Sequence, residues 1–577
     1  MIDDRTYSYL GIRGLQRPGD YNNKVLLAID GHTVNGNVYG DAYFGQELGL
    51  DMEAVERIEV VRGPGSTLYG GSAVLAVVNV VTRRPASEPG VSAHAWMGGA
   101  GERRGEVRLA AARPGRPAWT VSASWLDARG LDLYFPEFDG PATNFGRAPG
   151  GDAEQANAVL GSAEWGGTRA AFKFNQRMKR IPTASFHSMF DDTRNRAYDG
   201  HDFVELSHTG RPAATAELSG RAYWDRTHYY SYGVYDMGGY RAENFDFGSG
   251  DVFGGETRLN WSPGPRNAAT FGAEGRYAAR ARLYNYDLEP FAFYGDLDDR
   301  GGLFAAYAQD EVRIGEGVRI AAGARLDRGR RLGPVVSPRA DLVWRAHGGL
   351  TWKLLAGSAF RAPTVYETSY RDGPPQPSGV ELGPERVRTV ETSLEQGLGP
   401  LTAILSAYRN QVRGLMDEAP FDSTGELDFF NRVRAEARGL EGELQWVGGD
   451  GTRARLAAAL QSTRDGTTGA ELSNSPRWNA HLVLTRAPLE SRVTLGAGVR
   501  YLSPRITLAG LRTRAALVAD ARLGVKGAHG AVLGFEVRNL FDARYGDPVS
   551  ASLAQDQILQ NPRSMFATLS LHSEAAR

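Results

Sequence analysis

From residue 90 onward the chain repeats one pattern, in which apolar and polar residues alternate along extended runs that are separated by turn residues. Residues 319–327 are representative, because their even positions are all apolar and their odd positions include Arg319, Arg325 and Asp327. Since successive side chains of a strand point to opposite faces, one face of such a run suits lipid and the other suits water. The pattern therefore predicts a wall of strands between these two environments.

The length of the runs favours a transmembrane barrel over a soluble sandwich. Runs such as 120–125 and 494–501 belong to segments that reach the ~9 to 11 residues needed to cross a bilayer at a tilt, whereas sandwich strands usually have ~5 or 6 residues. No stretch approaches the ~18 apolar residues of a membrane-spanning helix, and the best one, 73–81, is interrupted by Asn79. Any membrane crossing is therefore expected to use strands.

The connections alternate between short and long, as expected for a barrel with a periplasmic and an external rim. Tight turns are predicted at 114–116, 165–167, 209–212, 347–349, 397–400, 448–451 and 527–530. Long loops are predicted near 130–154, 178–201, 228–251, 282–300, 361–387, 414–430 and 540–562. Pairing the runs predicts an all-β transmembrane barrel of about 22 antiparallel strands, with both barrel ends at the short-turn rim.

The sequence pattern of residues 1–85 differs from that of the rest of the chain and predicts a small α+β module. Two short β-type runs, 25–29 and 57–61, each lead into a glycine turn. Residues 86–90 form a linker rich in proline and glycine, so the predicted units are a module at 1–85 and a barrel at 91–577. A barrel of this girth would leave an aqueous channel, and we expect the module to close it as a plug.

Composition excludes several functions. The 66 basic and 67 acidic residues are interspersed, so no basic face for nucleic acid is predicted. The absence of cysteine excludes disulfides, thiolate metal sites and cysteine nucleophiles. The chain starts without an apolar export signal, so it begins after any such signal or was never exported.

Seven strings stand out along the chain. In the module they are GIRG at 11–14, VLLAIDG at 25–31, VERIEVVRGPGSTLYG at 55–70 and AVLAVVNVVTR at 73–83. In the barrel they are FRAPTVYE at 360–367, LGPER at 382–386 and NLFDARY at 539–545. Together these strings resemble the TonB-dependent receptor family of outer-membrane proteins. The resemblance implies a monomeric, non-enzymatic receptor without a cofactor in the outer membrane of a Gram-negative bacterium. It also implies energised uptake of a scarce, bulky nutrient, with lipid, the TonB complex and a small-molecule ligand such as an iron-siderophore as partners.

The sequence departs from the family pattern in three places. No apolar-acidic stretch precedes residue 11 as a TonB box, so the plug is expected to be partial and truncated at its N-terminus. Leu75 and Ala76 stand where glycines are more usual, and residues 573–577 replace a terminal aromatic residue.

The plug strings predict structural and docking roles. Arg57, Glu59 and Arg62 alternate along one strand and are expected to pair with carboxylates of the barrel wall. Residues 63–65 are expected to form a turn, since proline fixes its φ and glycine leaves it free. A phosphate-binding loop is disfavoured, because the Lys-Ser/Thr pair is absent and no helix pattern follows at once. The predicted plug motif residues are Arg13, Gly14, Asp30, Gly31, Arg57, Glu59, Arg62, Gly63, Pro64, Gly65, Tyr69, Gly70 and Asn79.

Ligand capture is predicted from a polar, aromatic plug loop at 35–44 and from two aromatic barrel loops. The alternative for rings near strand ends is an aromatic girdle at the lipid interface. Arginines at 241, 282 and 361 are placed to meet an anionic complex, although lumen arginines also serve solvation. The ligand-binding candidates are Asn37, Tyr39, Tyr43, Tyr230, Tyr232, Tyr240, Arg241, Tyr284, Tyr286, Tyr294, Arg361 and Tyr366.

No metal site is predicted. Asp296, Asp298 and Asp299 offer oxygen ligands for Ca²⁺, but a solvated loop is the favoured interpretation. The ten histidines are scattered and none lies between 360 and 386, which disfavours haem.

A ferric siderophore is the favoured ligand, and cobalamin is the alternative. A passive porin would lack the N-terminal module. An outer-membrane enzyme would need a catalytic constellation, and His94, His208 and His481 show no suitable partner at strand spacing.

Overall fold

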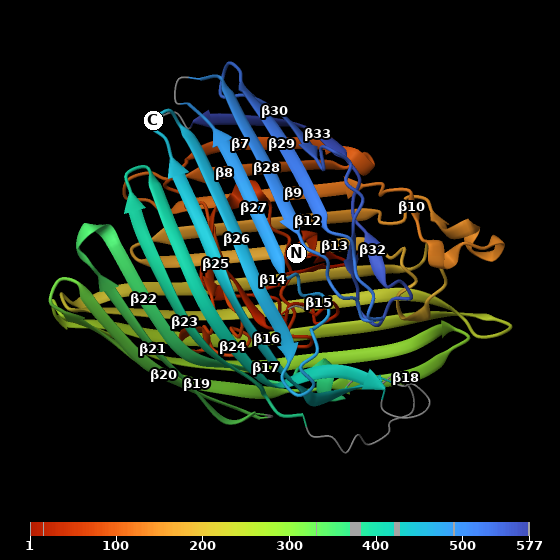
Figure 1. Ribbon diagram of the computed structural model, residues 1–577, viewed down its shortest axis with the longest axis horizontal. Coiled ribbons are helices and arrows are strands. Elements are labelled where there is room, and N and C mark those ends of the chain that lie inside the picture. The colour runs from red at the N-terminus through yellow and green to blue at the C-terminus, as the bar shows by residue number, and fades with distance from the viewer. Residues whose placement is uncertain are drawn as a thin grey trace.

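The computed structural model describes residues 2–15, 17–330, 332–369, 382–420, 427–488 and 491–574. Its main feature is one closed antiparallel barrel (Figure 1). The barrel sheet has 23 strands, of which β18 pairs only with β17, while β17 also pairs directly with β19. Twenty-two strands therefore close the ring, which confirms the predicted fold class and strand number.

The ring begins with β7 (Gly90–Gly98) and closes where β33 (Ser564–Glu574) pairs with it. The strands that follow β7 are β8 (Arg103–Ala111), β9 (Ala118–Ala128), β12 (Glu154–Trp165), β13 (Thr168–Arg180), β14 (Arg196–Ala213), β15 (Ala216–Asp236), β16 (Arg241–Gly264), β17 (Asn267–Glu289), β18 (Ala292–Asp298), β19 (Gly301–Ile314) and β20 (Val318–Gly329). The remaining strands before β33 are β21 (Leu332–Arg345), β22 (Leu350–Arg361), β23 (Glu385–Leu398), β24 (Leu401–Pro420), β25 (Leu427–Val447), β26 (Thr452–Asp465), β27 (Trp478–Arg486), β28 (Val493–Leu502), β29 (Ala516–Lys526) and β30 (Val532–Arg538).

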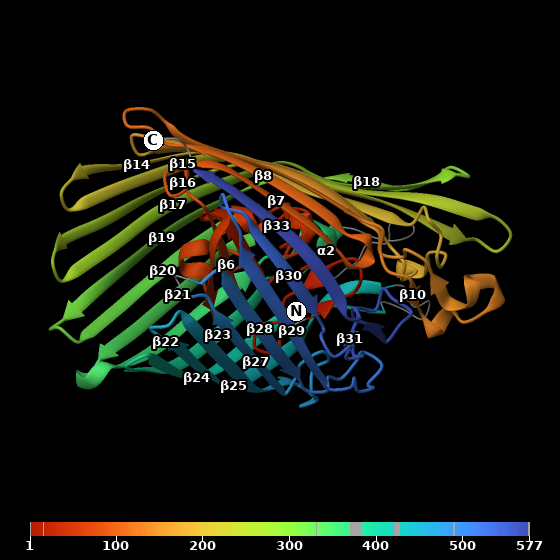
Figure 2. The ribbon, with the colours of Figure 1, turned by 90° about the horizontal axis from the view of Figure 1, so that it is seen from above.

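The N-terminal segment folds inside the ring, where Figure 2 shows it in red. Its four-stranded sheet has the order β4-β3-β6-β5, in which β3 and β6 are parallel. The elements are β1 (Ile2–Asp3), β2 (Ser8–Tyr9), β3 (Val25–Ile29), β4 (His32–Thr33), η1 (Gln46–Leu48), η2 (Met52–Ala54), β5 (Val55–Arg62), α1 (Ser66–Tyr69) and β6 (Ala76–Thr82). Its apolar core includes Leu27, Ile29, Val78 and Val80, which continue against Phe203 of the barrel wall.

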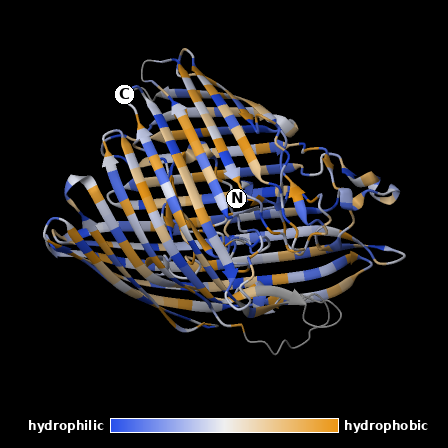
Figure 3. Ribbon diagram, in the orientation of Figure 1, coloured by the Kyte–Doolittle hydropathy of each residue, from blue (hydrophilic) through white to orange (hydrophobic). Residues whose placement is uncertain are grey.

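Alternation along the strands separates lipid-facing from lumen-facing residues, as predicted. On β20, Ile320 and Leu326 are exposed on the outside, whereas Arg325 and Asp327 are at most 1% exposed on the inside. Figure 3 shows the same alternation of apolar and polar residues on many strands. Among the described residues, no helix is long and apolar enough to cross a membrane.

The two rims differ as predicted, with one correction to a turn. Short turns fall at 112–117, 166–167, 346–349, 399–400, 448–451 and 527–531. The turn predicted at 209–212 lies instead at 214–215, because β14 continues through a register shift between Gly210 and Ala213.

Three of the predicted long loops are wrong in large part. Residues 228–251 and 282–300 belong mainly to β15–β18. Residues 414–420 and 427–430 belong to β24 and β25, and residues 421–426 lie outside the described part of the chain. The loop predicted at 178–201 is present but shorter, because β13 continues to Arg180 and β14 begins at Arg196. The tyrosines and phenylalanines that suggested loops alternate with small or polar residues, which suits a strand equally well.

The other long connections carry short elements on the rim opposite the short turns. These are η3 (Gly99–Gly101), β10 (Leu133–Tyr134), η4 (Pro136–Phe138), η5 (Pro141–Gly146), β11 (Arg147–Ala148), η6 (Ser185–His187), α2 (Val365–Ser369), β31 (Gly546–Pro548) and β32 (Gln557–Leu559), while η7 (His347–Gly349) lies on the short-turn rim. Residues 370–381 of the predicted loop 361–387 lie outside the described part of the chain. A single turn of helix, α1, follows Gly65 directly, so the expectation that no helix follows the glycine turn is wrong.

Candidate functional site

Six tyrosines gather at the outer end of the lumen and are called the mouth cluster here. Four come from the plug, Tyr7, Tyr21, Tyr39 and Tyr43, and two come from the barrel, Tyr229 and Tyr366. The Tyr39 ring is central, with centroids 5.1 Å from Tyr366, 5.8 Å from Tyr21 and 5.9 Å from Tyr229. All six rings are half-buried, so they form a partly open aromatic surface.

Glycines in β16 let the plug loop approach the wall. A Cβ at Gly248 would lie 2.7 Å from the Tyr39 hydroxyl, and one at Gly250 would lie 1.6 Å from Asn37 Oδ1. Asn37 Nδ2 donates to the carbonyl of Arg280 at 2.9 Å, which fixes the loop against β17. The predicted residues Asn37, Tyr39, Tyr43 and Tyr366 therefore lie together at the mouth.

Burial sets the charge state of this surface. It raises the pKa of the Tyr39 and Tyr43 phenols well above their usual range. Burial also raises the pKa of Asp41 to about 6. The mouth cluster thus offers neutral hydroxyl groups and aromatic faces near neutral pH.

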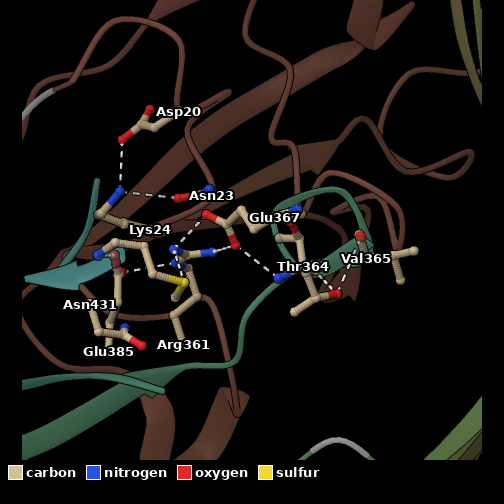
Figure 4. A network of polar contacts seen from close by, with 12 residues as sticks. Asp20, Asn23, Lys24, Arg361, Thr364, Val365, Glu367, Glu385 and Asn431 are labelled. Carbon is tan, nitrogen blue, oxygen red and sulfur yellow. Dashed lines mark hydrogen bonds and ion pairs between the residues drawn. The ribbon is translucent and has the colours of Figure 1, made fainter. Parts of the chain in front are cut away.

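Arg361 lies beneath the mouth in a closed ionic group (Figure 4). Its guanidinium donates to Glu385 Oε2 at 2.8 Å and to the two carboxylate oxygens of Glu367 at 2.7 and 2.9 Å. Glu385 also accepts from the backbone N–H of Met416 at 2.8 Å. Because Arg361 is only 2% exposed, these contacts favour a structural role that joins β22, α2 and β23.

Arg13 and Arg62 join the plug to the barrel wall. Arg13 Nη2 lies 2.7 Å from Glu391 of β23 and 3.2 Å from Glu441 of β25, and the guanidinium lies 4.1 Å from the Tyr408 ring centroid. Arg62 Nη1 lies 2.9 Å from Glu441. Arg62 thus contacts the wall as predicted.

The same prediction is wrong for Arg57 and Glu59. Arg57 pairs with Glu56 and Glu59 of its own strand, and Glu59 accepts from Asn79 Nδ2 at 3.0 Å. The reason is that β5 forms the free edge of the plug sheet, and all of its residues after Val55 are exposed.

The DG turn after β3 meets the opposite wall. Asp30 accepts from Arg169 of β13 at 2.6 Å, and the Gly31 carbonyl accepts from Arg221 of β15 at 2.6 Å. The Gly31 N–H donates to Asn79 Oδ1 at 2.8 Å, which ties this turn to β6. These residues brace the plug.

At two other positions, close contacts with the barrel leave no room for a side chain larger than that of glycine. Gly14 has φ +75°, and a Cβ there would lie 2.3 Å from Thr463 Oγ1 and 2.4 Å from Ser475 Oγ. A Cβ at Gly70, with φ +78°, would lie 2.8 Å from Arg325 Nη2. Both glycines bring the plug backbone against inward-pointing barrel residues.

The turn at 63–65 is internal to the plug. Gly63 has φ +90°, and its N–H donates to the Leu75 carbonyl at 2.9 Å. The N–H of Gly65, after Pro64, donates to the Ala73 carbonyl at 2.9 Å, and Tyr69 packs on the Leu26 and Ala73 cluster. The turn therefore has the predicted conformation.

Four of the predicted ligand tyrosines point away from the lumen. Tyr230 and Tyr232 of β15 and Tyr284 and Tyr286 of β17 occupy the face opposite to Tyr229 and Leu283, which contact the plug side. Tyr294 lies on β18 and donates to Asp287 at 2.6 Å. Tyr240 and Arg241 lie at the tip of the β15–β16 hairpin, where both are exposed.

The acidic residues 296–299 are paired with arginines. Asp296 lies 2.7 Å from Arg282, Asp298 lies 2.8 Å from Arg300, and Asp299 lies 3.2 Å from Arg330. Within the described ranges, no group of three acidic or histidine side chains is arranged to hold a metal ion.

His32 was missed by the sequence analysis. Its Nδ1 lies 3.0 Å from Glu205 and its Nε2 lies 2.8 Å from Asp225, so the buried ring bridges two wall strands. Its place directly after the Asp30-Gly31 turn was the only available signal.

Comparison with known families matches both parts of the chain. The family model described as TonB-dependent Receptor Plug Domain matches residues 3–77. The model described as TonB dependent receptor-like, beta-barrel, matches residues 118–540.

Individual relatives are similar over shorter segments. A segment of 84 residues is 39% identical to the ferrichrome outer membrane transporter/phage receptor of Escherichia coli (strain K12), covering 15% of this chain and 10% of that protein. A segment of 213 residues is 26% identical to the vitamin B12 transporter BtuB of Vibrio vulnificus (strain YJ016), covering 37% of this chain and 33% of the relative. The chain thus aligns with a third or less of each relative's length.

Solved structures share the whole fold. The copper transporter OprC superposes with a TM-score of 0.80 at 14% identity, covering 98% of this chain and 94% of that one. A mutant of the ferric enterobactin receptor PfeA of Pseudomonas aeruginosa superposes with a TM-score of 0.76 at 18% identity, covering 97% and 91%. At these identities the likeness concerns the fold alone.

Proposed function

Because this chain belongs to the TonB-dependent receptor family of outer-membrane proteins, we propose that it takes up a ferric siderophore through a ligand site at the mouth cluster. Members of this family are transporters and not enzymes. The outer membrane is accordingly its location, with the short-turn rim in the periplasm.

The mouth cluster is the observation that carries the proposal. Tyrosines from the plug and the barrel converge there, so one ligand can contact both parts at once. Rigid rings with hydroxyl tips bind a bulky, polar organic ligand at a small entropic cost. We place Asn37, Tyr39, Tyr43 and Tyr366 in this site, and we omit Arg361 because its donors are engaged by two carboxylates.

The relatives support an iron-carrying ligand and also suggest a second candidate ligand. The ferrichrome transporter is 39% identical over a segment of 84 residues. The vitamin B12 transporter of Vibrio vulnificus is 26% identical over a longer segment of 213 residues, which makes cobalamin the second candidate.

Coupling to TonB follows from family membership and is part of the proposal. Arg13 and Arg62 hold the plug through carboxylates of the wall, and such contacts can be released by a pull from the periplasm. We therefore expect uptake to stop when the proton gradient is dissipated, while ligand binding at the surface persists.

A binding and growth screen under iron limitation tests the ligand. Labelled ferric siderophores and cobalamin are offered to cells that produce the wild type, Tyr39→Ala or Tyr134→Ala. Tyr134 of β10 is an exposed tyrosine that does not belong to the mouth cluster. We expect saturable binding of a ferric siderophore that is at least tenfold weaker in Tyr39→Ala and unchanged in Tyr134→Ala. Binding of cobalamin alone, or equal binding by Tyr39→Ala, would contradict the proposal.

A further inference from the structure

The outer face of the barrel has an aromatic layer at the height where lipid ends. Trp224, Phe253, Tyr277 and Phe304 lie on this face of β15, β16, β17 and β19. The short-turn ends of these strands are Ala216, Gly264, Asn267 and Ile314, respectively. Each ring thus stands about one bilayer-crossing length, ~9 to 11 tilted residues, from that rim, so this layer is the external aromatic girdle.

A charged belt lies directly above the girdle on the same face. Arg226 Nε lies 2.8 Å from Asp251 Oδ1, and Arg280 Nη1 lies 3.8 Å from Asp251 Oδ2. Asp251 also accepts from the girdle residue Trp224 at 3.2 Å. Charged side chains at this height suit the phosphate and headgroup layer of a membrane.

Above the belt the outer face becomes aromatic again. Tyr198 and Tyr230 stack with centroids 4.4 Å apart, and Phe245 lies 5.3 Å from both Tyr232 and Tyr286. Tyr284 extends the row, 5.0 Å from Tyr286. We call these six rings, which come from β14, β15, β16 and β17, the upper aromatic patch.

Strand pairing shows that the patch faces outward. Tyr198 pairs with Tyr230, and Phe245 pairs with both Tyr232 and Tyr286, so these rings share one face of the sheet. On the other face, Ala281 and Leu283 pack with the plug residue Val38. A ligand in the lumen therefore does not meet the patch.

The patch stands beyond the hydrocarbon layer. The short-turn ends of β15 and β17 are Ala216 and Asn267, and Tyr230 and Tyr284 lie much farther along these strands than the girdle residues do. With a rise of ~3.3 Å per residue and a tilt of ~40°, these two rings stand roughly 35 to 45 Å above the short-turn rim, whereas the apolar band is only ~25 Å tall. The patch is therefore not the girdle.

We propose that the upper aromatic patch binds the saccharide part of the glycolipid that forms the outer leaflet, lipopolysaccharide. The patch continues the lipid-facing wall beyond the charged belt, so its natural neighbour is the sugar layer that continues the same lipid. The apolar C–H face of a pyranose ring packs on an aromatic ring, and tyrosine hydroxyls bond to sugar hydroxyls.

Arg196 beside the patch adds a polar contact for the same occupant, and its Nη1 lies 3.4 Å from the Tyr198 hydroxyl. Guanidinium groups bind phosphate and acidic sugars. The Arg282 guanidinium lies 5.0 Å from the Tyr284 ring centroid, but two of its donors are engaged by Asp296, so it is not assigned to this contact. This inference depends on the orientation of the barrel in the membrane and is independent of the transported ligand.

The test uses the full chain in phospholipid nanodiscs that contain no glycolipid. Lipid-free core oligosaccharide is titrated in, and saturation-transfer NMR reports its binding. We expect saturable binding by the wild type and at least tenfold weaker binding by the triple variant Tyr230→Ser, Tyr284→Ser, Tyr286→Ser. Tyr134→Ser is the control for an exposed tyrosine elsewhere, and Tyr230→Trp, which keeps a ring, should bind like the wild type.

Thermal unfolding of each variant verifies that the barrel is intact before binding is compared. Equal binding by the wild type and a folded triple variant overturns the proposal. Equal binding of dextran and core oligosaccharide also overturns it. The proposal is also overturned if the triple variant differs from the wild type only in its oligomeric state, because that result assigns the patch to a second copy of this chain.

Discussion

Gly14 shows how a single position decides whether the plug seats against the wall. Its φ of +75° strains any other residue, and a Cβ there would lie 2.3 Å from Thr463 Oγ1. Gly31 is a matched position, since its φ is +80° and its nearest neighbour, Arg221 Nη1, lies 4.0 Å away.

We therefore expect Gly14→Ala to destabilise the seated plug by about 2 to 4 kcal/mol, the sum of backbone strain and overpacking, and Gly31→Ala by only about 1 kcal/mol. Hydrogen exchange of plug amides within the intact barrel measures both. Equal effects of the two substitutions would show that the close contact at Gly14 is unimportant.

His32 makes the seating of the plug depend on pH. Burial lowers the pKa of its imidazole, but Asp225 and Glu205 outweigh burial, and the net pKa is raised. Because the raised value belongs to the folded state, the contribution of His32 is complete below the ordinary value of about 6.5 and is lost as the pH rises through the raised value.

At pH 6 we expect the wild type to release its plug at a higher urea concentration than His32→Gln does. The difference between the two urea midpoints is expected to shrink by pH 9. Burial raises the pKa of Glu47 to about 7, so Glu47 also titrates in this pH range. Its titration changes stability in the same direction in the wild type and in His32→Gln. The comparison of the two proteins therefore isolates His32. A difference that is constant across this pH range would refute the assignment.

At the scale of elements, the contacts of the plug with the wall are unequal. Arg13, whose side chain is 1% exposed, joins the carboxylates of Glu391 and Glu441 on two wall strands. Arg57, on the free edge strand β5, pairs with Glu56 and Glu59 of the plug itself. We infer that contacts such as those of Arg13 hold the plug in place in the barrel, whereas the Arg57 pairs do not.

Arg13→Gln is therefore expected to weaken seating by roughly 1 to 3 kcal/mol, since it removes the buried cation that faces the partly buried Glu391, while Glu441 keeps its contact with Arg62. Arg57→Gln is expected to change it little, because the pair that it breaks is exposed. The force that unseats the plug in single-molecule pulling from its N-terminus compares the two. A lower force for Arg57→Gln than for Arg13→Gln would reverse this ranking.

Most barrel elements could be predicted because each depends on local signals. Period-two alternation marked β20, and glycine or proline marked the turns at 166–167 and 527–531. The extensions of β15–β17 were not predicted, because Tyr230, Tyr232 and Tyr284 fit a binding loop as well as a strand. Only the pairing of neighbouring strands distinguishes the two.

Only part of the site could be predicted, because only some of its residues give a local signal in the sequence. The tyrosines of the plug loop stand together in the sequence, so Tyr39 and Tyr43 were found. The contacts of His32 with Glu205 and Asp225 join residues that are 173 and 193 positions apart, and no local pattern reports them.

At the scale of the whole molecule, the barrel closes through its own strands, since β33 pairs with β7. The plug contributes no strand to that ring in the described part of the chain. The wall is therefore expected to persist without the plug, and the plug decides whether the lumen conducts. The boundary at 86–90 remains a prediction that a deletion can test.

Conductance across a planar bilayer shows whether the plug closes the lumen, when the full chain is compared with a chain that lacks residues 1–85. We expect the full chain to stay closed and the shortened chain to conduct ions steadily. If the full chain conducts as well as the shortened one, or if a folded shortened barrel stays closed, the plug does not close the lumen.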